Sequence, residues 1–276
     1  MNRACWLTLL SLALPCPVLA QGVLVAPHAV HIDHTTRAGS ITLFNPGSTP
    51  AEVTISLAFG YPQTDSAGDI SLPLSDSAPP GQPSATAWIQ AFPRRVTVPP
   101  QQRQTVRLLA TPPQGLADGE YWARVIIGAK GGQVPVAGVT DTVAVRVGLT
   151  LEVRTVIALT YRKGALTTGL AAGPLRAAYE SDSVFARMKL TRQGQSAYLG
   201  TARAEVVDSA GQVVGTTELP VAVYYELDPR IGIPVGRLAA GRYKVRLEVA
   251  SERTDLPPKV VLRAPAVRDS AEVEVR

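Results

Sequence analysis

The chain contains 276 residues, with 27 Lys and Arg against 22 Asp and Glu, and a formal net charge of +5. The basic residues are scattered among acids and apolar strand positions, so no basic run indicates binding to nucleic acid. The only cysteines, Cys5 and Cys16, lie in an N-terminal segment with the features of an export signal, which excludes a disulfide-stabilised mature protein. Its stability must come from hydrophobic cores, and about 250 residues are enough for two domains.

The N-terminal segment is predicted to be a signal peptide. Arg3 precedes an apolar run at residues 6–14, and Val18-Leu19-Ala20 supplies the small residues of a cleavage site. This run is too short to cross a bilayer, and no later run is long enough to do so. Lipid attachment at Cys16 is disfavoured because a proline precedes it. We expect cleavage after Ala20 and a periplasmic protein without a membrane span, with the cell surface as the alternative location.

The stretch HAVHIDH, residues 28–34, contains all three histidines and one aspartate, which suggests a metal site. In an extended strand, His28 and His34 share one face, whereas His31 and Asp33 point to the other. No single ion could then contact all three rings, and no further His or Cys is present in the mature chain to complete a ligand set. We therefore expect no metal and no cofactor.

Short segments rich in Val, Ile, Thr and Leu recur along the chain, each bounded by Pro, Gly, Asn or Asp. Regular strands with such punctuation predict antiparallel sandwiches, and helix signals are almost absent. The fold class is therefore all-β. The clearest predicted strands are residues 40–44, 51–59, 103–110, 120–128, 142–154, 201–207 and 242–250.

An internal repeat indicates two similar domains. LADGEYWARVII begins at Leu116 and LAAGRYKVRLEV begins at Leu238, so Leu-Ala-x-Gly-x-Tyr is followed in both by an alternating strand. A tyrosine at this place is typical of the corner of immunoglobulin-like sandwiches, where its hydroxyl bonds the preceding loop. We expect two immunoglobulin-like β-sandwich domains in tandem, with boundaries at residues 21–154 and 155–276.

The first copy of the repeat differs from the second on its outward face. Trp122 and Ile126 lie there, on a face that water should cover. Two large apolar side chains on such a face indicate that something covers them. The cover is either the second domain or a neighbouring loop, or else a partner protein.

The first half of the chain resembles the PapD-type periplasmic chaperones of pilus and fimbria assembly. The resemblance covers roughly residues 23–156 and depends on four stretches: HAVHIDHTTRAGSITLFNPG, FPRRVTVPPQQRQTVRLLATPP, LADGEYWARVII and DTVAVRVGLTLEV. It implies a protein that performs no chemistry, in which the last strand of the first domain completes the sheet of an unfinished client. The corresponding row alternates along that strand, and the sequence also allows these residues to face their own core: Val143, Val145, Val147, Leu149, Leu151 and Val153.

The resemblance also implies an anchor for the carboxylate at the end of the client chain. In that family, one basic residue of the first strand and one of the last strand hold this carboxylate in the cleft between the domains. Here the first position falls on His28 or His31, and the second on Glu152 or Arg154, depending on the alignment. Thr155-Val156-Ile157 replaces the aromatic-Arg-Pro segment that usually follows. The resemblance thus assigns His28 and Arg154 as the candidate anion anchor.

The sequence therefore predicts a periplasmic chaperone-like protein that binds or assembles an exported client, pilin-like or a surface protein, by β-strand pairing. No G-x-S-x-G elbow, phosphate-binding glycine loop or H-E-x-x-H helix is present, so we expect no enzyme and assign no catalytic residue. The alternative is a structural or adhesive cell-surface module without chaperone activity. The client's identity and the participation of an outer-membrane usher stay open.

Overall fold

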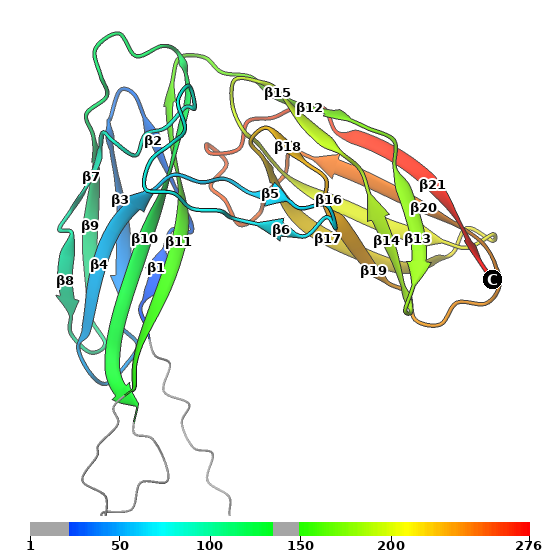
Figure 1. Ribbon diagram of the computed structural model, residues 1–276, viewed down its shortest axis with the longest axis horizontal. Coiled ribbons are helices and arrows are strands. Elements are labelled where there is room, and N and C mark those ends of the chain that lie inside the picture. Colours follow the sequence, from blue (N-terminus) through cyan, green and yellow to red (C-terminus); the bar gives the residue numbers. More distant parts are fainter. Residues whose placement is uncertain (1–21, 135–148) are drawn as a thin grey trace, which may run out of the picture.

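The computed structural model describes residues 22–134 and 149–276. The predicted signal peptide, and with it Val143, Val145 and Val147, lies outside the described residues. The described chain forms 21 strands, which confirms the all-β prediction. Two sandwiches lie at an angle to each other (Figure 1). The described residues contain no helix that could span a membrane.

The first sandwich has two facing sheets in the immunoglobulin order. The neighbours β1-β3-β9-β7 match strands A, B, E and D of that fold, and β4, β10 and β11 match C, F and G. The first sheet comprises β1 (Leu24–Ala26), β3 (Ala38–Phe44), β9 (Arg103–Ala110) and β7 (Ile89–Phe92). The second, in the order β2-β11-β10-β4-β8, comprises β2 (Ala29–Asp33), β11 (Leu149–Lys163), β10 (Gly119–Val134), β4 (Ala51–Ala58) and β8 (Arg95–Val98).

Period-two alternation fills the first core. In β4, Val53 and Ile55 point inward and are buried, while Thr54 between them is exposed. In β9, Val106 and Leu108 do the same from the opposite sheet. Burying such a side chain contributes roughly 1.5–3 kcal/mol, so this alternation is the main source of stability in a domain without disulfides.

Strand β11 continues well past the expected domain boundary at Arg154. It pairs with β10 as far as Lys163, and its residues Ile157, Leu159 and Tyr161 belong to the first core. The strand ends at Lys163 and is followed by Gly164, whose φ of 82° lies in the left-handed region that favours glycine. The first sandwich therefore ends at Lys163, because the alternating pattern that fills its core does not stop at Arg154.

The second sandwich has its own core. Its largest sheet, in the order β17-β16-β20-β21, faces two three-stranded sheets, β13-β14-β19 and β12-β15-β18. In β20, Val245, Leu247 and Val249 are buried, as the alternation predicts. The strands are β12 (Thr168–Ala172), β13 (Arg176–Glu180), β14 (Ser183–Arg187), β15 (Leu190–Gly194), β16 (Tyr198–Val207), β17 (Val213–Val223), β18 (Glu226–Leu227), β19 (Arg230–Pro234), β20 (Gly241–Ala250) and β21 (Val267–Val275).

The repeated tyrosine forms a corner in both domains, as predicted. The hydroxyl of Tyr121 donates to the carbonyl of Ala117 at 2.9 Å, and that of Tyr243 donates to Ala239 at 3.1 Å. Each bond joins the start of a strand to the loop before it. The Leu-Ala-x-Gly-x-Tyr repeat thus forms the same tyrosine corner once in each sandwich.

Removing either corner hydroxyl should cost the same small amount. We expect Tyr121→Phe and Tyr243→Phe each to lower the free energy of unfolding of their own domain by about 1 kcal/mol, because one hydrogen bond is lost and the ring packing is kept. Chemical denaturation of the two variants checks this. Equal stability of variants and wild type would show that the hydroxyls bond water equally well.

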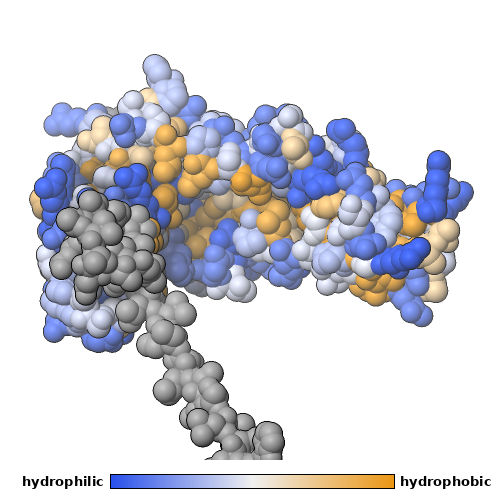
Figure 2. Space-filling view, turned by 60° about the horizontal axis from the view of Figure 1, so that its bottom comes forward, coloured by the Kyte–Doolittle hydropathy of each residue, from blue (hydrophilic) through white to orange (hydrophobic). Residues whose placement is uncertain are grey.

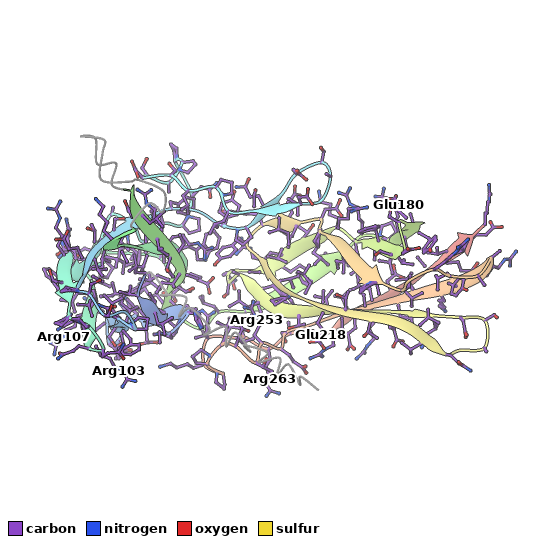
Figure 3. The ribbon with its side chains drawn as sticks, turned by 90° about the horizontal axis from the view of Figure 1, so that it is seen from below. Arg103, Arg107, Glu180, Glu218, Arg253 and Arg263 are labelled. Carbon is purple, nitrogen blue, oxygen red and sulfur yellow. The ribbon has the colours of Figure 1, made fainter. Side chains whose placement is uncertain are left out.

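A long connection between β4 and β7 braces the two domains. It carries the hairpin β5 (Gln63–Thr64) and β6 (Ile70–Ser71), which reaches the second sandwich. There the amide of Arg230 donates to the carbonyl of Gly68 at 2.9 Å, and the amide of Asp228 donates to Thr64 Oγ1 at 3.0 Å. Figure 3 shows this hairpin along one side of the junction, and the segment that carries Arg253 and Arg263 along the other.

Candidate functional site

Strand β11 has a partner along its whole length on one side only. It pairs with β10 along its length apart from a register shift beside Leu151, whereas the parallel strand β2 covers only residues 158–162 on its other side. Within the described chain, no strand pairs with residues 149–157 on that second side. The reason is that the first strand changes sheets: β1 pairs with β3 in the opposite sheet, and only β2 lies beside β11. We refer to residues 149–157 as the open edge.

The pairing of residues 158–162 with β2 determines which backbone groups face outward on the open edge. The carbonyl of Arg162 accepts a hydrogen bond from the amide of His34 at 3.0 Å, so Arg162 directs its backbone groups toward β2. Backbone direction alternates along a strand. Glu152, Arg154 and Val156 therefore direct both N–H and C=O away from β10, to where the described chain provides no strand. Such a row is a template for pairing with another strand.

The exposure of the inward-facing side chains on the open edge increases from Ile157 to Leu151. Ile157 is buried in the first core, Thr155 is half-buried, Val153 is 39% exposed and Leu151 is 44% exposed. These residues share the inward face, so Leu151 and Val153 of the predicted row are exposed, and Thr155 and Ile157, which continue the same face beyond the row, enter the core. Leu149 lies on the same strand by its backbone. Figure 2 shows apolar surface in the hollow between the two sandwiches.

Trp122 does not flank the open edge as an exposed contact, which corrects the partner-binding role predicted for it. It is 1% exposed and packs with Tyr224 of the second domain, the two ring centroids 4.6 Å apart. Tyr61, from the long connection, lies against both rings. The cover is thus the second domain together with a loop, one of the two explanations that the sequence left open. Ile126 is half-buried beside Val156, and its contact with a partner stays a prediction.

A buried carboxylate joins the two domains beside this aromatic cluster. Glu120 Oε2 accepts from Arg162 Nε at 2.7 Å, and Oε1 accepts from Trp122 Nε1 at 2.7 Å. The amide of Ala197, in the second domain, donates to Oε1 at 3.0 Å, and the hydroxyl of Ser196 also donates to Glu120. Four donors therefore satisfy one carboxylate, which is the condition under which a buried charge is tolerated. Sequence reasoning missed this pair, because its two charged residues lie 42 positions apart.

His31 faces the same junction and stays neutral there. Burial chiefly, and in addition the Arg162 guanidinium, lowers the pKa of His31 to about 4. Its Nδ1 is buried and has no hydrogen-bond partner within the described residues. His31 therefore contributes no cation to the cleft at neutral pH.

Because the pKa of His31 is low in the folded protein, the free energy of unfolding should fall as the pH is lowered. The unfolded histidine has a pKa of about 6.5, so between pH 6.5 and about 4 the unfolded state binds a proton that the folded state does not. The free energy of unfolding should fall by up to about 1.4 kcal/mol per pH unit as pH drops through this window. In His31→Asn this fall should be smaller, since the variant keeps every other titrating group. Denaturation curves that fall in parallel for both proteins would contradict the assignment.

The two candidate anchor residues lie on the surface and face carboxylates of their own chain. Arg154 is 69% exposed and its Nε lies 3.0 Å from Glu152 Oε1. His28 is exposed and close enough to Asp255 to add to the effect of Arg253, which is the main cause of the lowered pKa of Asp255. The anchor role of His28 and Arg154 stays a prediction.

The three histidines are not brought together. His34 Nδ1 bonds the Tyr161 hydroxyl, and His31 points into the junction. Across residues 22–134 and 149–276, no group of three His, Cys, Asp or Glu side chains could hold a metal ion.

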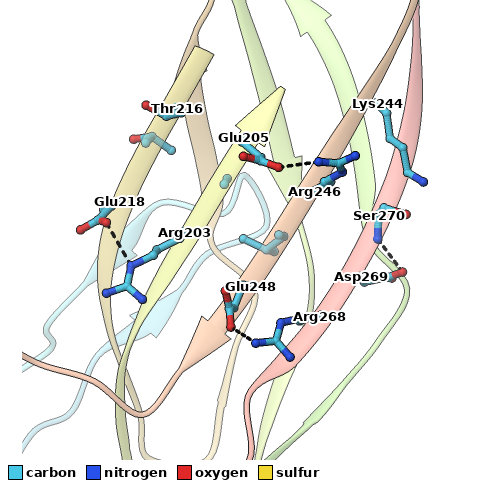
Figure 4. A pocket seen from close by; sticks show the side chains of 13 residues that line it. Arg203, Glu205, Thr216, Glu218, Lys244, Arg246, Glu248, Arg268, Asp269 and Ser270 are labelled. Atoms are coloured by element: carbon cyan, nitrogen blue, oxygen red, sulfur yellow. Dashed lines mark hydrogen bonds and ion pairs between the residues drawn. The ribbon is translucent and has the colours of Figure 1, made fainter. Parts of the chain in front are cut away.

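The charged outer face of the second sandwich is not a competing site. Figure 4 shows a shallow hollow on the β17-β16-β20-β21 sheet, lined by cross-strand ion pairs. Arg246 pairs with Glu205 at 3.0 Å, and Arg203 pairs with Glu218 at 3.0 Å. Acids and bases neutralise each other on exposed strands here, as on an ordinary solvated sheet face.

Comparison with solved structures finds proteins described as chaperones. A Pseudomonas aeruginosa CupB2 chaperone is 13% identical, with a TM-score of 0.44, over 92% of this chain and 100% of that one. The Salmonella enterica SafB chaperone, solved in complex with the SafA pilin, is part of a structure that matches at 15% identity and a TM-score of 0.41, over 90% of this chain and 96% of the matched one. The E. coli chaperone DraB matches at 14% identity and a TM-score of 0.40, over 92% and 97%. No family model and no curated protein matches the sequence. Since every one of these TM-scores is below 0.5, the assignment below depends on the geometry of this chain.

Proposed function

We propose that this protein is a periplasmic chaperone-like protein that holds an exported client by β-strand pairing and performs no chemistry. The observation that carries the proposal is the open edge, a strand of the first sandwich with no neighbour on one side in the described chain. Soluble proteins normally cover or interrupt such an edge, because it recruits other strands. An edge without a partner strand over residues 149–157 in the described chain therefore offers a surface for pairing.

The mechanism follows from the direction of the groups on β11. A client strand would lie in line with β2 and exchange hydrogen bonds with the outward backbone groups of Glu152, Arg154 and Val156. Its side chains would meet Leu151 and Val153, which are partly exposed on the inward side, and Ile126 would flank the other side. Main-chain bonds supply affinity in such pairing, and the alternating side chains supply register. No cofactor is needed.

A pilin-like subunit or a surface protein is the client class that fits. Such proteins cross the periplasm before they assemble, and an unfinished sheet has a vacant edge that a free strand can fill. The solved structures named above include a chaperone bound to a pilin, and the same client class is proposed here. An outer-membrane usher would then receive the client.

Hydrogen exchange can test the proposal on the free protein and on a complex. The amides of Glu152, Arg154 and Val156 should exchange rapidly in the free protein, whereas those of Val153, Thr155 and Ile157, which bond β10, should be protected. The ligand is an acetylated peptide of alternating valine and threonine, long enough to span the open edge, which we call the probe peptide. Its addition should protect the first set of amides.

The alternative function, a spacer or adhesive module on the cell surface, predicts a different result. In that case neither the probe peptide nor a periplasmic extract should protect the amides of the open edge. Protection of those amides in the free protein would contradict the chaperone proposal directly, because it would show that the edge is covered within the chain.

A further inference from the structure

We propose that the hairpin at residues 63–71 is a latch that fixes the angle between the two sandwiches. It docks on the second sandwich at a place away from the chain link between the domains. Its release leaves both sandwiches folded and lets their angle vary. This role concerns the arrangement of the domains, and it does not depend on strand pairing at the open edge.

The buried junction between the sandwiches lies beside the chain link. The first sandwich ends at Lys163, and the first strand of the second begins at Thr168. Ser196, whose hydroxyl donates to Glu120, is bonded through its backbone to Thr167 and Thr168. Domains of one chain move relative to each other unless a large interface holds them. A second attachment at a distance from the link would therefore fix an angle that a junction beside the link leaves variable.

The latch provides this second attachment. Figure 1 shows its tip against the second sandwich, well away from the link. Three hydrogen bonds join the two, each accepted by the hairpin: Thr64 Oγ1 accepts from the amide of Asp228 at 3.0 Å, the carbonyl of Ser66 from Arg187 Nη1 at 3.0 Å, and the carbonyl of Gly68 from the amide of Arg230 at 2.9 Å. The contact thus extends along the whole turn of the hairpin.

The tip of the latch keeps its own shape and fits closely against Arg230. The amide of Asp69 donates to Asp65 Oδ1 at 2.9 Å, and the amide of Gly68 donates to the carbonyl of Asp65 at 3.1 Å. Gly68 is buried and has a φ of 90°, and a Cβ added there would lie 2.8 Å from both Cβ and N of Arg230. Only glycine permits both this turn and this contact.

The surface that receives the tip carries a row of three arginines. Arg176, Arg187 and Arg230 are direct partners across the neighbouring strands β13, β14 and β19. Like charges directly opposite each other destabilise a sheet. Asp228 pairs with Arg187 at 2.7 Å, and Glu180 pairs with Arg230 at 2.9 Å. The turn of the latch adds a carbonyl to this row and carries two further carboxylates, so its charge complements the surface on which it docks.

Double electron–electron resonance can measure the angle, because residues 21–276 contain no cysteine and two labels can be placed at will. Spin labels on Thr105→Cys and Thr216→Cys, both exposed and on different sandwiches, report the distance between the domains. Gly68→Val places a side chain against Arg230, and it should broaden the distance distribution by about twofold or more. Thr64→Val removes the acceptor for the amide of Asp228 and keeps the shape of the side chain, so it should broaden the distribution less.

Gly81→Val is the matched control. Gly81 lies on the same connection with a φ of 81°, and a Cβ added there meets nothing within 4 Å, so this variant strains the backbone without touching the second sandwich. Its distance distribution should equal that of the wild type. An unchanged distribution in both latch variants would overturn the inference, because the buried junction would then fix the angle alone. Equal broadening by Gly81→Val would overturn it as well. If circular dichroism shows that Gly68→Val does not fold, Thr64→Val decides.

Discussion

Replacing Val156 with proline should weaken binding of the probe peptide by about tenfold or more while the protein stays folded. The amide of Val156 points away from β10, so proline removes an outward donor without breaking a bond inside the sheet. The loss of one hydrogen bond costs about 1 kcal/mol, and the proline ring also stands where a partner strand would approach. Fluorescence anisotropy with the probe peptide gives the affinity, and circular dichroism confirms the fold.

Two further substitutions control this result. Val156→Ala keeps the amide and removes most of the side chain, so it should bind nearly as well as the wild type. Ile157→Pro shifts the proline by one residue to a buried position whose amide bonds β10, and it should destabilise the first sandwich by about 3 kcal/mol or more. Unchanged affinity in a folded Val156→Pro protein would show that partners do not bind along this edge.

Glu120→Gln should cause a large loss of stability. The substitution leaves Arg162 buried without a counter-charge, and removing one partner of a buried ion pair costs about 3–5 kcal/mol. Trp122 lies at the junction and bonds Glu120, so its fluorescence reports the change directly. Thermal denaturation followed by tryptophan fluorescence should give a lower midpoint than that of the wild type.

The double variant Glu120→Gln with Arg162→Met separates charge from packing. If the loss comes from an unpaired guanidinium, the second substitution should restore most of the stability, because no charge is then left buried. A double variant as unstable as the single one would show instead that the bonds from Ala197 and Ser196 to the carboxylate are the main contribution. Small-angle scattering would then show whether the two sandwiches still hold one fixed angle.

Features that depend on neighbours along the chain could be read from the sequence. Alternation along the predicted strand 242–250 places Val245, Leu247 and Val249 on one face, and all three are buried. The corner tyrosines were identified from a six-residue repeat, and both hydroxyls bond the residue four positions earlier. Such features depend on a period of two and on local turns, which short stretches of sequence contain.

Features that depend on the path of the chain could not be read in this way. The position of Trp122 on a strand was correct, but its cover comes from Tyr224 and Tyr61, about 100 and 60 residues away along the chain. The domain boundary was expected at Arg154, although the core-forming alternation continues to Tyr161. Sequence alternation shows that a face is apolar, and it does not show what lies against that face.

By itself, the sequence determined the strands, the inward face of each and the two tyrosine corners, because these follow from side-chain alternation and local hydrogen bonds. Only the tertiary structure decided that β11 is left with an open edge and that Glu120 and Arg162 neutralise each other between the domains. Both outcomes depend on long-range placement: the first strand crosses to the opposite sheet at Ala26, and the second sandwich folds back onto β10. The free energy of pairing depends on the contact between two segments that are distant in sequence, so it cannot be predicted from either segment alone.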